Sequence, residues 1–194
     1  MLILASQSPR RREMFDRLGL DYKAMTSDAD ETITESLSPA EYVKTLALRK
    51  AKALSSAVSK DDYVIAADTV VALDGEIYGK PIDYADAFRM IASFSGKTHE
   101  VYTAFAIVRG ERVYAEAVAT AVTFRTLSDH EIDYYIQKEA PYDKAGAYGI
   151  QELAGIFVEK IEGNFDNVVG LPLCQLEVAM KQEFGVSLFS FAKA

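Results

Sequence analysis

The chain has 194 residues, of which 49% are hydrophobic and 26% charged, a composition that fits one globular domain of ordinary size. Its net charge of −8 disfavours non-specific binding to nucleic acids or membranes, because both usually need a basic face. Cys174 is the single cysteine, which excludes an internal disulfide, and no apolar run is long enough to span a bilayer. The first residues lack the basic segment of a signal peptide, so we expect a cytoplasmic location.

The first residues predict a strand that runs directly into a basic helix. Residues 2–5 are apolar, Ser8 suits a helix N-cap, and Pro9 suits the first helical position. The free N–H groups of such a helix start lie beside the guanidinium groups of residues 10–12, which together favour a phosphate anion. A solvated basic helix start is an equal alternative at this point.

The rest of the chain alternates further strands and helices. Apolar runs and turn signals predict strands at residues 22–26, 63–67, 70–73, 76–78, 101–108, 112–124 and 156–161. Apolar periodicity and caps predict helices at residues 9–18, 39–58, 84–94, 128–138 and 172–184, a hairpin turn at 74–75, and a flexible turn at 146–149. This interleaving, with added hairpins, indicates an α/β fold with a mixed sheet.

Lys50 breaks the apolar pattern of the helix predicted at residues 39–58. It falls four residues from both Leu46 and Leu54, inside the apolar stripe. A lysine facing inward needs a partner or a water-filled cleft, because burying a lone charge is costly. We favour a cation that faces a cleft over a lysine that snorkels at the edge of the stripe.

Two acidic positions are candidates for chemistry. Asp68 follows the buried strand at 63–67, and α/β folds often place ligand sites at the carboxyl ends of such strands. Such an aspartate can hold a metal or act as a general base, and it can equally be a turn residue that bonds its own backbone. The adjacent acids Asp30 and Glu31 lie in a polar loop, where they can bind Mg²⁺ or simply be solvated.

Other reactive residue types give weaker signals. Residues 75–80 are one residue too short for a nucleotide-binding P-loop, although Lys80 can still be presented on a rigid turn. His99 and His130 lack the spacing of metal ligands or of a catalytic triad, so we assign them no role. Cys174 falls early in an amphipathic helix, where we expect a core position rather than a nucleophile.

Seven short blocks, taken in order, resemble the Maf family of nucleoside triphosphate pyrophosphatases. The blocks lie at residues 4–11, 30–31, 46–51, 67–69, 79–81, 143–151 and 170–172. The resemblance implies a two-lobed, ITPase-like α/β fold with an elongated mixed sheet, flanking helices and a central cleft. It also implies one Maf-like domain over residues 1–194, with its two lobes around one nucleotide cleft.

The resemblance implies hydrolysis of a nucleoside triphosphate to the monophosphate and pyrophosphate. The block at residues 144–151 is similar to that of dTTP/UTP pyrophosphatases, so we expect dTTP and UTP as substrates, with modified pyrimidine nucleotides as a further class. The alternative is a non-catalytic, nucleotide-sensing regulator of septum formation and cell division. A homodimer is the assembly that relatives often form, and neither nucleic acid nor membrane is expected as a partner.

The resemblance also carries roles onto single residues. Asp68 matches the general base, and Glu31 matches an acidic loop residue that acts through a divalent metal, Mg²⁺ or Mn²⁺, held by Glu31, Asp68 or both. The other matches divide between phosphate contacts and selection of the base: Lys50, Lys80, Ser8 and Arg11 for the phosphates, and Arg10, Thr69 and Gln151 for the base.

Overall fold

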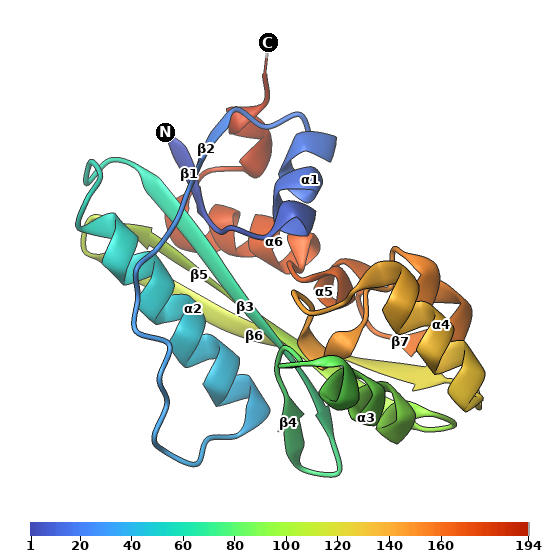
Figure 1. Cartoon of the computed structure of the whole chain (residues 1–194). Coiled ribbons are helices and arrows are strands. Elements are labelled where there is room, and N and C mark those ends of the chain that lie inside the picture. Colours follow the sequence, from blue (N-terminus) through green and yellow to red (C-terminus); the bar gives the residue numbers. More distant parts are fainter. Residues whose placement is uncertain (194) are drawn as a thin grey trace. The chain divides into compact units, whose positions relative to one another are not determined.

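A computed structural model describes residues 1–193 and gives the bounds of each element (Figure 1). The strands are β1 (Leu2–Ala5), β2 (Tyr22–Met25), β3 (Tyr63–Leu73), β4 (Glu76–Tyr78), β5 (Thr98–Arg109), β6 (Arg112–Phe124) and β7 (Val158–Glu162). The α-helices are α1 (Pro9–Arg17), α2 (Pro39–Ser55), α3 (Tyr84–Phe94), α4 (Asp129–Glu139), α5 (Phe165–Val169) and α6 (Leu173–Phe184). Three short 3-10 helices are η1 (Ala145–Ala147), η2 (Leu153–Phe157) and η3 (Leu188–Phe191).

The strands form one mixed sheet, which confirms the predicted α/β class. Their order is β2-β1-β3-β5-β6-β7, and β4 pairs with β3 outside this path. β1 is parallel to both β2 and β3, whereas the β3–β4 and β6–β7 pairs are antiparallel. Parallel neighbours need crossover connections, and α1 and α2 provide them here.

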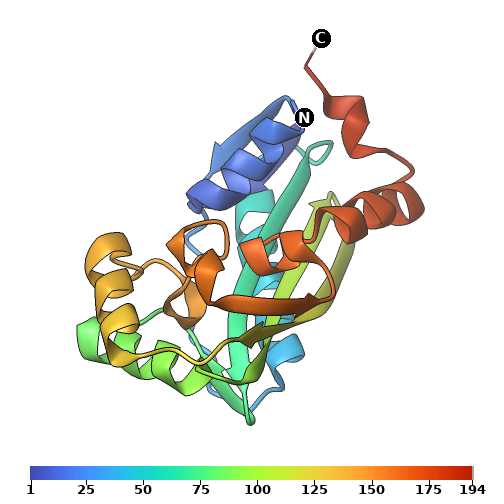
Figure 2. The same ribbon diagram turned by 90° about the vertical axis from the view of Figure 1, so that its right-hand side faces the viewer.

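The chain divides into two compact units. Unit 1 consists of Met1–Asp68, Thr103–Val118 and the segment from Gly170 onward, and unit 2 consists of Thr69–Tyr102 and Ala119–Val169. In unit 1, α2 and α6 lie on opposite faces of the strands (Figure 1 and Figure 2). The apolar stripe of α2 is buried, as its periodicity predicts.

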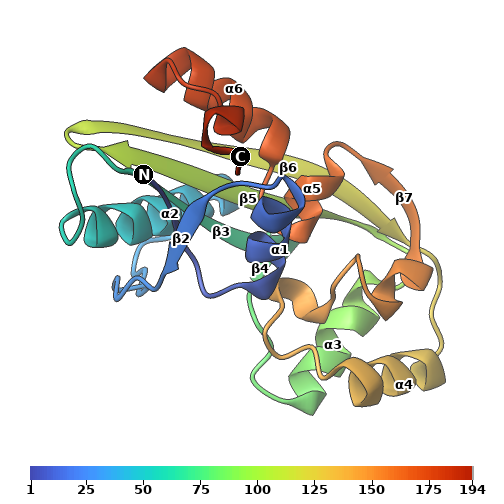
Figure 3. The same cartoon turned by 90° about the horizontal axis from the view of Figure 1, so that it is seen from above.

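Unit 2 is built around an aromatic core. Its helices α3 and α4 lie side by side, and η1 packs against α3 while η2 packs against α4 (Figure 3). Phe94, Phe124 and Tyr148 surround the buried imidazole of His99 with ring centroids 4.4–5.5 Å away. This core supports the segment that connects α4 to η2.

Several predicted bounds differ from the structure, and three of the differences reflect local features of the chain. The helix predicted at residues 39–58 ends at Ser55, where the Ser55 and Ser56 hydroxyls donate to the carbonyls of residues 52 and 53 and compete with further helix formation. The strand predicted at 156–161 is displaced to Val158–Glu162, because residues 153–157 form η2. The strands predicted at 63–67 and 70–73 are one continuous strand, β3.

Cys174 is exposed rather than in the core, so its early position in α6 places it on the outer side of that helix. The predicted turn at residues 146–149 overlaps the end of η1, and its backbone is hydrogen-bonded at both Gly146 and Gly149. None of the helices in residues 1–193 is long and apolar enough to cross a membrane.

Candidate active site

Lys50 joins two acidic residues in unit 1. Its Nζ lies 2.6 Å from Asp68 Oδ1 and 3.2 Å from Glu31 Oε2. The Lys50 and Asp68 side chains are only 16% and 13% exposed, whereas Glu31 is 58% exposed. The lysine inside the apolar stripe therefore has two charged partners, and the nearer of them, Asp68, is largely buried with it.

The loop that carries Glu31 is fastened to α2. Arg49 donates from Nη1 to the carbonyl oxygens of Asp30 and Thr32, at 3.2 and 2.6 Å, so it holds the backbone on both sides of Glu31. The Ser27 hydroxyl donates to the Lys50 carbonyl at 3.1 Å. Thr32 N–H also donates to the Asp30 carboxylate, and this hydrogen bond lowers the pKa of Asp30. Arg49 is not among the residues predicted for the site, although it directly precedes Lys50 in α2.

The start of α1 brings a second cation to this part of unit 1. Ser8 is the N-cap, as predicted, although its hydroxyl makes no capping hydrogen bond. Arg11 donates from Nε to the Gly170 carbonyl at 2.7 Å. Burial lowers the pKa of Arg11, and the carboxylates of Asp68 and Glu31 oppose this shift. Arg10 is half-buried in the same helix turn.

Asp68 occupies a different place in its strand from the predicted one. It lies in the interior of β3, not at the carboxyl end of a strand, and Thr69 follows it in the same strand. A carboxylate is tolerated there because the Lys50 ammonium donates to it, which compensates the loss of water. Asp68 ends the first segment of unit 1, and Thr69 begins unit 2.

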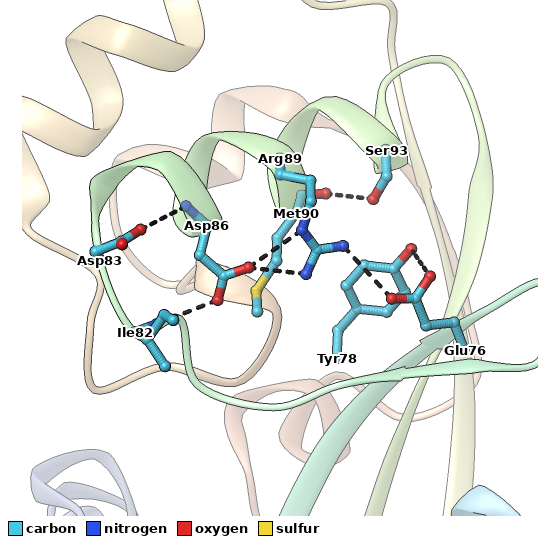
Figure 4. Close-up of polar contacts among 8 residues, drawn as sticks. All are labelled: Glu76, Tyr78, Ile82, Asp83, Asp86, Arg89, Met90 and Ser93. Carbon is cyan, nitrogen blue, oxygen red and sulfur yellow. Dashed lines mark hydrogen bonds and ion pairs between the residues drawn. The ribbon is translucent and has the colours of Figure 1, made fainter.

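Lys80 lies exposed in unit 2, on the turn between β4 and α3. Figure 4 shows the polar contacts that flank this turn. Arg89 donates to Asp86 at 2.8 Å and to Glu76 at 3.4 Å, and Asp86 accepts from the backbone of Ile82 at 3.2 Å. The strand before Lys80 and the helix after it are thus joined by side-chain contacts.

Gln151 is exposed in a turn of unit 2. The Glu152 N–H donates to the Gly149 carbonyl at 3.0 Å, which closes this turn around Ile150 and Gln151. The structure therefore groups the predicted residues in two sets. Unit 1 holds Ser8, Arg10, Arg11, Glu31, Lys50 and Asp68, and unit 2 holds Thr69, Lys80 and Gln151.

Two carboxylates of unit 1 are suited to a divalent metal. Within residues 1–193 there is no cluster of three His, Cys, Asp or Glu side chains that could hold a metal without other ligands. Mg²⁺ is usually held by one or two carboxylates, with waters and substrate phosphates completing its shell. Glu31 and Asp68 fit that pattern, because Lys50 contacts one oxygen of each and each carboxylate has a second.

Sequence and structure comparisons extend these observations. A family model described as "Maf-like protein" matches residues 1–183. The chain is 46% identical over 191 residues to a dTTP/UTP pyrophosphatase of Hahella chejuensis, covering 97% of this chain and 94% of the relative. It is 46% identical over 189 residues to a dTTP/UTP pyrophosphatase of Alkaliphilus oremlandii, covering 96% and 98% respectively.

A solved structure with a more distant likeness is a nucleoside-triphosphatase / dITP/XTP pyrophosphatase of Mycobacterium abscessus. Its TM-score is 0.43 at 15% identity, covering 65% of this chain and 75% of that one. At this level the likeness carries no conclusion about function.

Proposed function

The chain belongs to the Maf family, and from this premise we propose that it is a nucleoside triphosphate pyrophosphatase that hydrolyses dTTP and UTP. The products are the nucleoside monophosphate and pyrophosphate. The observation that carries the proposal is the shared contact of Lys50 with Asp68 and Glu31. It supplies a largely buried carboxylate and a second acid, both within contact distance of one ammonium group.

In the proposed reaction, Asp68 accepts a proton from the attacking water. Its Oδ1 accepts from Lys50, so we assign Oδ2 as the atom that removes a proton from the attacking water. The water oxygen forms a bond to the α-phosphorus, and the bond from that phosphorus to the bridging oxygen breaks. The electron pair leaves with pyrophosphate, and the developing charge needs fixed cations nearby.

Lys50 and Arg11 are the unit 1 cations proposed for that charge. Arg11 presents a planar guanidinium that suits phosphate oxygens, and Ser8 begins the helix on which it lies. A bound Mg²⁺ or Mn²⁺, held by Glu31, Asp68 or both, would neutralise phosphate charge when present. Arg49 has a structural part in the proposal, because it holds the loop that carries Glu31.

The residues of unit 2 enter the proposal by their chemistry. Lys80 is assigned to the phosphates, because an exposed lysine offers them a compact positive charge and side-chain contacts hold its turn in place. Gln151 is assigned to base selection, with Arg10 and Thr69, because a carboxamide both donates to and accepts from a pyrimidine edge. An enzyme is favoured over a non-catalytic regulator of septum formation, because a nucleotide sensor needs no general base.

A turnover panel tests the reaction and the substrate class together. Purified protein is supplied with Mg²⁺ or Mn²⁺ and with dTTP, UTP, CTP, ATP, GTP or 7-methyl-GTP, and pyrophosphate is measured separately from orthophosphate. We expect pyrophosphate from dTTP and UTP in preference to the others, and loss of turnover with a chelator. Binding of nucleotide without release of pyrophosphate would favour the non-catalytic regulator. Orthophosphate as the first product would contradict cleavage between the α- and β-phosphates.

A further inference from the structure

Lys144 is a buried cation of unit 2 for which the proposed chemistry has no use. Its side chain is 8% exposed, and its Nζ lies 3.0 Å from Asp143 Oδ1 and 3.1 Å from Glu152 Oε2. Burying an ammonium is costly unless it is paired, so these carboxylates fix where Lys144 lies. The contact with Glu152 connects two residues that lie on either side of a seven-residue segment, residues 145–151.

The backbone of this segment passes directly beside the ion pair. A Cβ atom at Gly149 would lie 2.8 Å from Glu152 Oε2 and 3.0 Å from Lys144 Cε, so glycine alone fits without displacing the pair. Gly149 N–H donates to the Tyr135 hydroxyl at 3.3 Å, and Gly149 accepts from the Glu152 N–H at 3.0 Å. The ion pair therefore lies against the turn in which Gln151 is the third residue, and the Glu152 N–H hydrogen bond closes that turn.

The same segment is also fastened to the turn that carries Lys80. Gly146 N–H donates to the Gly79 carbonyl at 2.9 Å, one residue before Lys80. Tyr148, two residues further along, is held in the aromatic core by its 2.8 Å contact with His99 Nε2. Movement of the 144–152 segment would therefore affect both Gln151 and the Lys80 turn.

We propose that the Lys144–Glu152 ion pair is a positioning device for pyrimidine selection, an inference that rests on the proposed function. A carboxamide has a donor on one side and an acceptor on the other, and rotation by half a turn exchanges them. At N3 and at the exocyclic group on C4, uracil and thymine present the opposite donor–acceptor order to cytosine. Gln151 discriminates between these bases only if its carboxamide is presented in one orientation, and the closed turn fixes the backbone from which it extends.

Selectivity in turnover is the first test. Lys144→Met keeps the unbranched stem and removes the charge, Lys144→Arg keeps a cation, and Lys160→Met makes the same change at a 60% exposed lysine of the same unit. We expect the ratio of kcat/KM for UTP to that for CTP to fall about tenfold in Lys144→Met, the size of a lost orienting contact. The other two variants should keep this ratio within about twofold of the wild-type value.

A second measurement does not depend on activity. Hydrogen exchange of the nucleotide-free protein reports local opening of the backbone. Lys144→Met should raise exchange at Gly146, Gly149 and Glu152 by about tenfold or more, while Lys144→Arg and Lys160→Met leave it unchanged. If Lys144→Met does not fold because Glu152 is left unpaired, the double variant Lys144→Met/Glu152→Leu replaces the pair with apolar groups and should show the same loss of selectivity and of protection.

The outcomes separate the two proposals. An unchanged UTP to CTP ratio in a folded Lys144→Met or double variant overturns the selectivity role, even if exchange rises. Unchanged exchange in the same variants overturns the claim that the ion pair holds the turn. Absence of pyrophosphate release by the wild-type protein would refute the proposed function, and the exchange result would still decide whether Lys144 positions Gln151.

Discussion

Among single residues, Lys50 is the one that organises the unit 1 site. Its stem belongs to the buried face of α2, and its ammonium contacts both Asp68 and Glu31. Removing either partner changes the electrostatic surroundings of the other, because both share one cation. Variants at these positions should therefore be judged on binding and turnover separately.

Asp68→Asn should abolish most turnover and leave nucleotide binding. Asparagine retains an oxygen that can accept from Lys50, but it cannot take a proton from water, so kcat should fall by roughly 10²- to 10⁴-fold. Steady-state turnover of UTP and a nucleotide titration measure the two effects. Asp74→Asn is the matched control, because Asp74 is 81% exposed in the β3–β4 turn. Near-wild-type turnover of Asp68→Asn would exclude Asp68 as the base.

His99 makes the folded state sensitive to acid. It is 1% exposed, and burial lowers its pKa from 6.5 to about 3. Below pH 6.5 the unfolded chain binds a proton at this imidazole and the folded chain does not. The free energy of unfolding should therefore decrease as the pH falls from 6.5 towards 3, by up to about 1.4 kcal/mol per pH unit from this group.

Urea unfolding at pH 7.5, 6 and 5 tests this contribution. His99→Gln removes the titrating group, so its stability should fall less steeply with acid than that of the wild-type protein. His130→Gln serves as the control, because His130 is exposed at the start of α4. Parallel pH dependences for the wild type and His99→Gln would show that the buried imidazole does not contribute.

At the scale of elements, the backbone of η1 depends on a glycine for two separate reasons. Gly146 has a φ of +66°, which side-chain-bearing residues rarely adopt. A Cβ atom there would also lie 2.6 Å from Cγ2 of Val71. Gly75, in the β3–β4 turn, has a φ of +85° with nothing within 4 Å of a Cβ. The two positions therefore separate backbone strain from steric overlap.

Gly146→Ala should destabilise the protein by about 3 kcal/mol, which combines strain with overpacking. Gly75→Ala should cost only about 1 kcal/mol, because strain acts there alone. The free energy of unfolding in urea measures both variants. Equal losses would mean that Val71 moves aside at little cost.

Much at this scale could be predicted from sequence. The helix α3 (Tyr84–Phe94) has the predicted bounds, and the capping boxes at Ser38 and Ser128 form as expected, because these signals are local. The interior position of Asp68 could not be predicted, since a charge within a strand is acceptable only with its partner 18 residues away. Lys50 was found because it interrupts an apolar stripe. Lys144 showed no such interruption, and its role depends on tertiary contacts.

At the scale of the whole molecule, the two units are not consecutive pieces of chain. The chain passes between them at residues 68/69, 102/103, 118/119 and 169/170. The first three passages lie inside β3, β5 and β6, so these strands contribute residues to both units. Melting of either unit removes hydrogen bonds from strands that the other unit also needs.

Thermal unfolding should accordingly be one cooperative transition. Differential scanning calorimetry should give equal calorimetric and van't Hoff enthalpies, the criterion for two-state behaviour. Far-ultraviolet circular dichroism, which follows the backbone, and near-ultraviolet circular dichroism, which follows the aromatic core, should give the same midpoint temperature of unfolding. Two resolved transitions would show that the units unfold independently despite their shared strands.

The interrupted order of the units also limits how such a protein can be recombined with its relatives. An exchange of Thr69–Tyr102 and Ala119–Val169, the segments that contain Lys80, Lys144 and Gln151, needs four junctions. Only the junction after Val169 falls outside a strand, at the end of α5. At the other three, a splice shifted by one residue would turn the following side chains to the opposite face of the sheet. An exchange of segments between relatives would therefore transfer base preference only if it preserved the register of all three strands. Substitution of single residues can change base preference without this requirement.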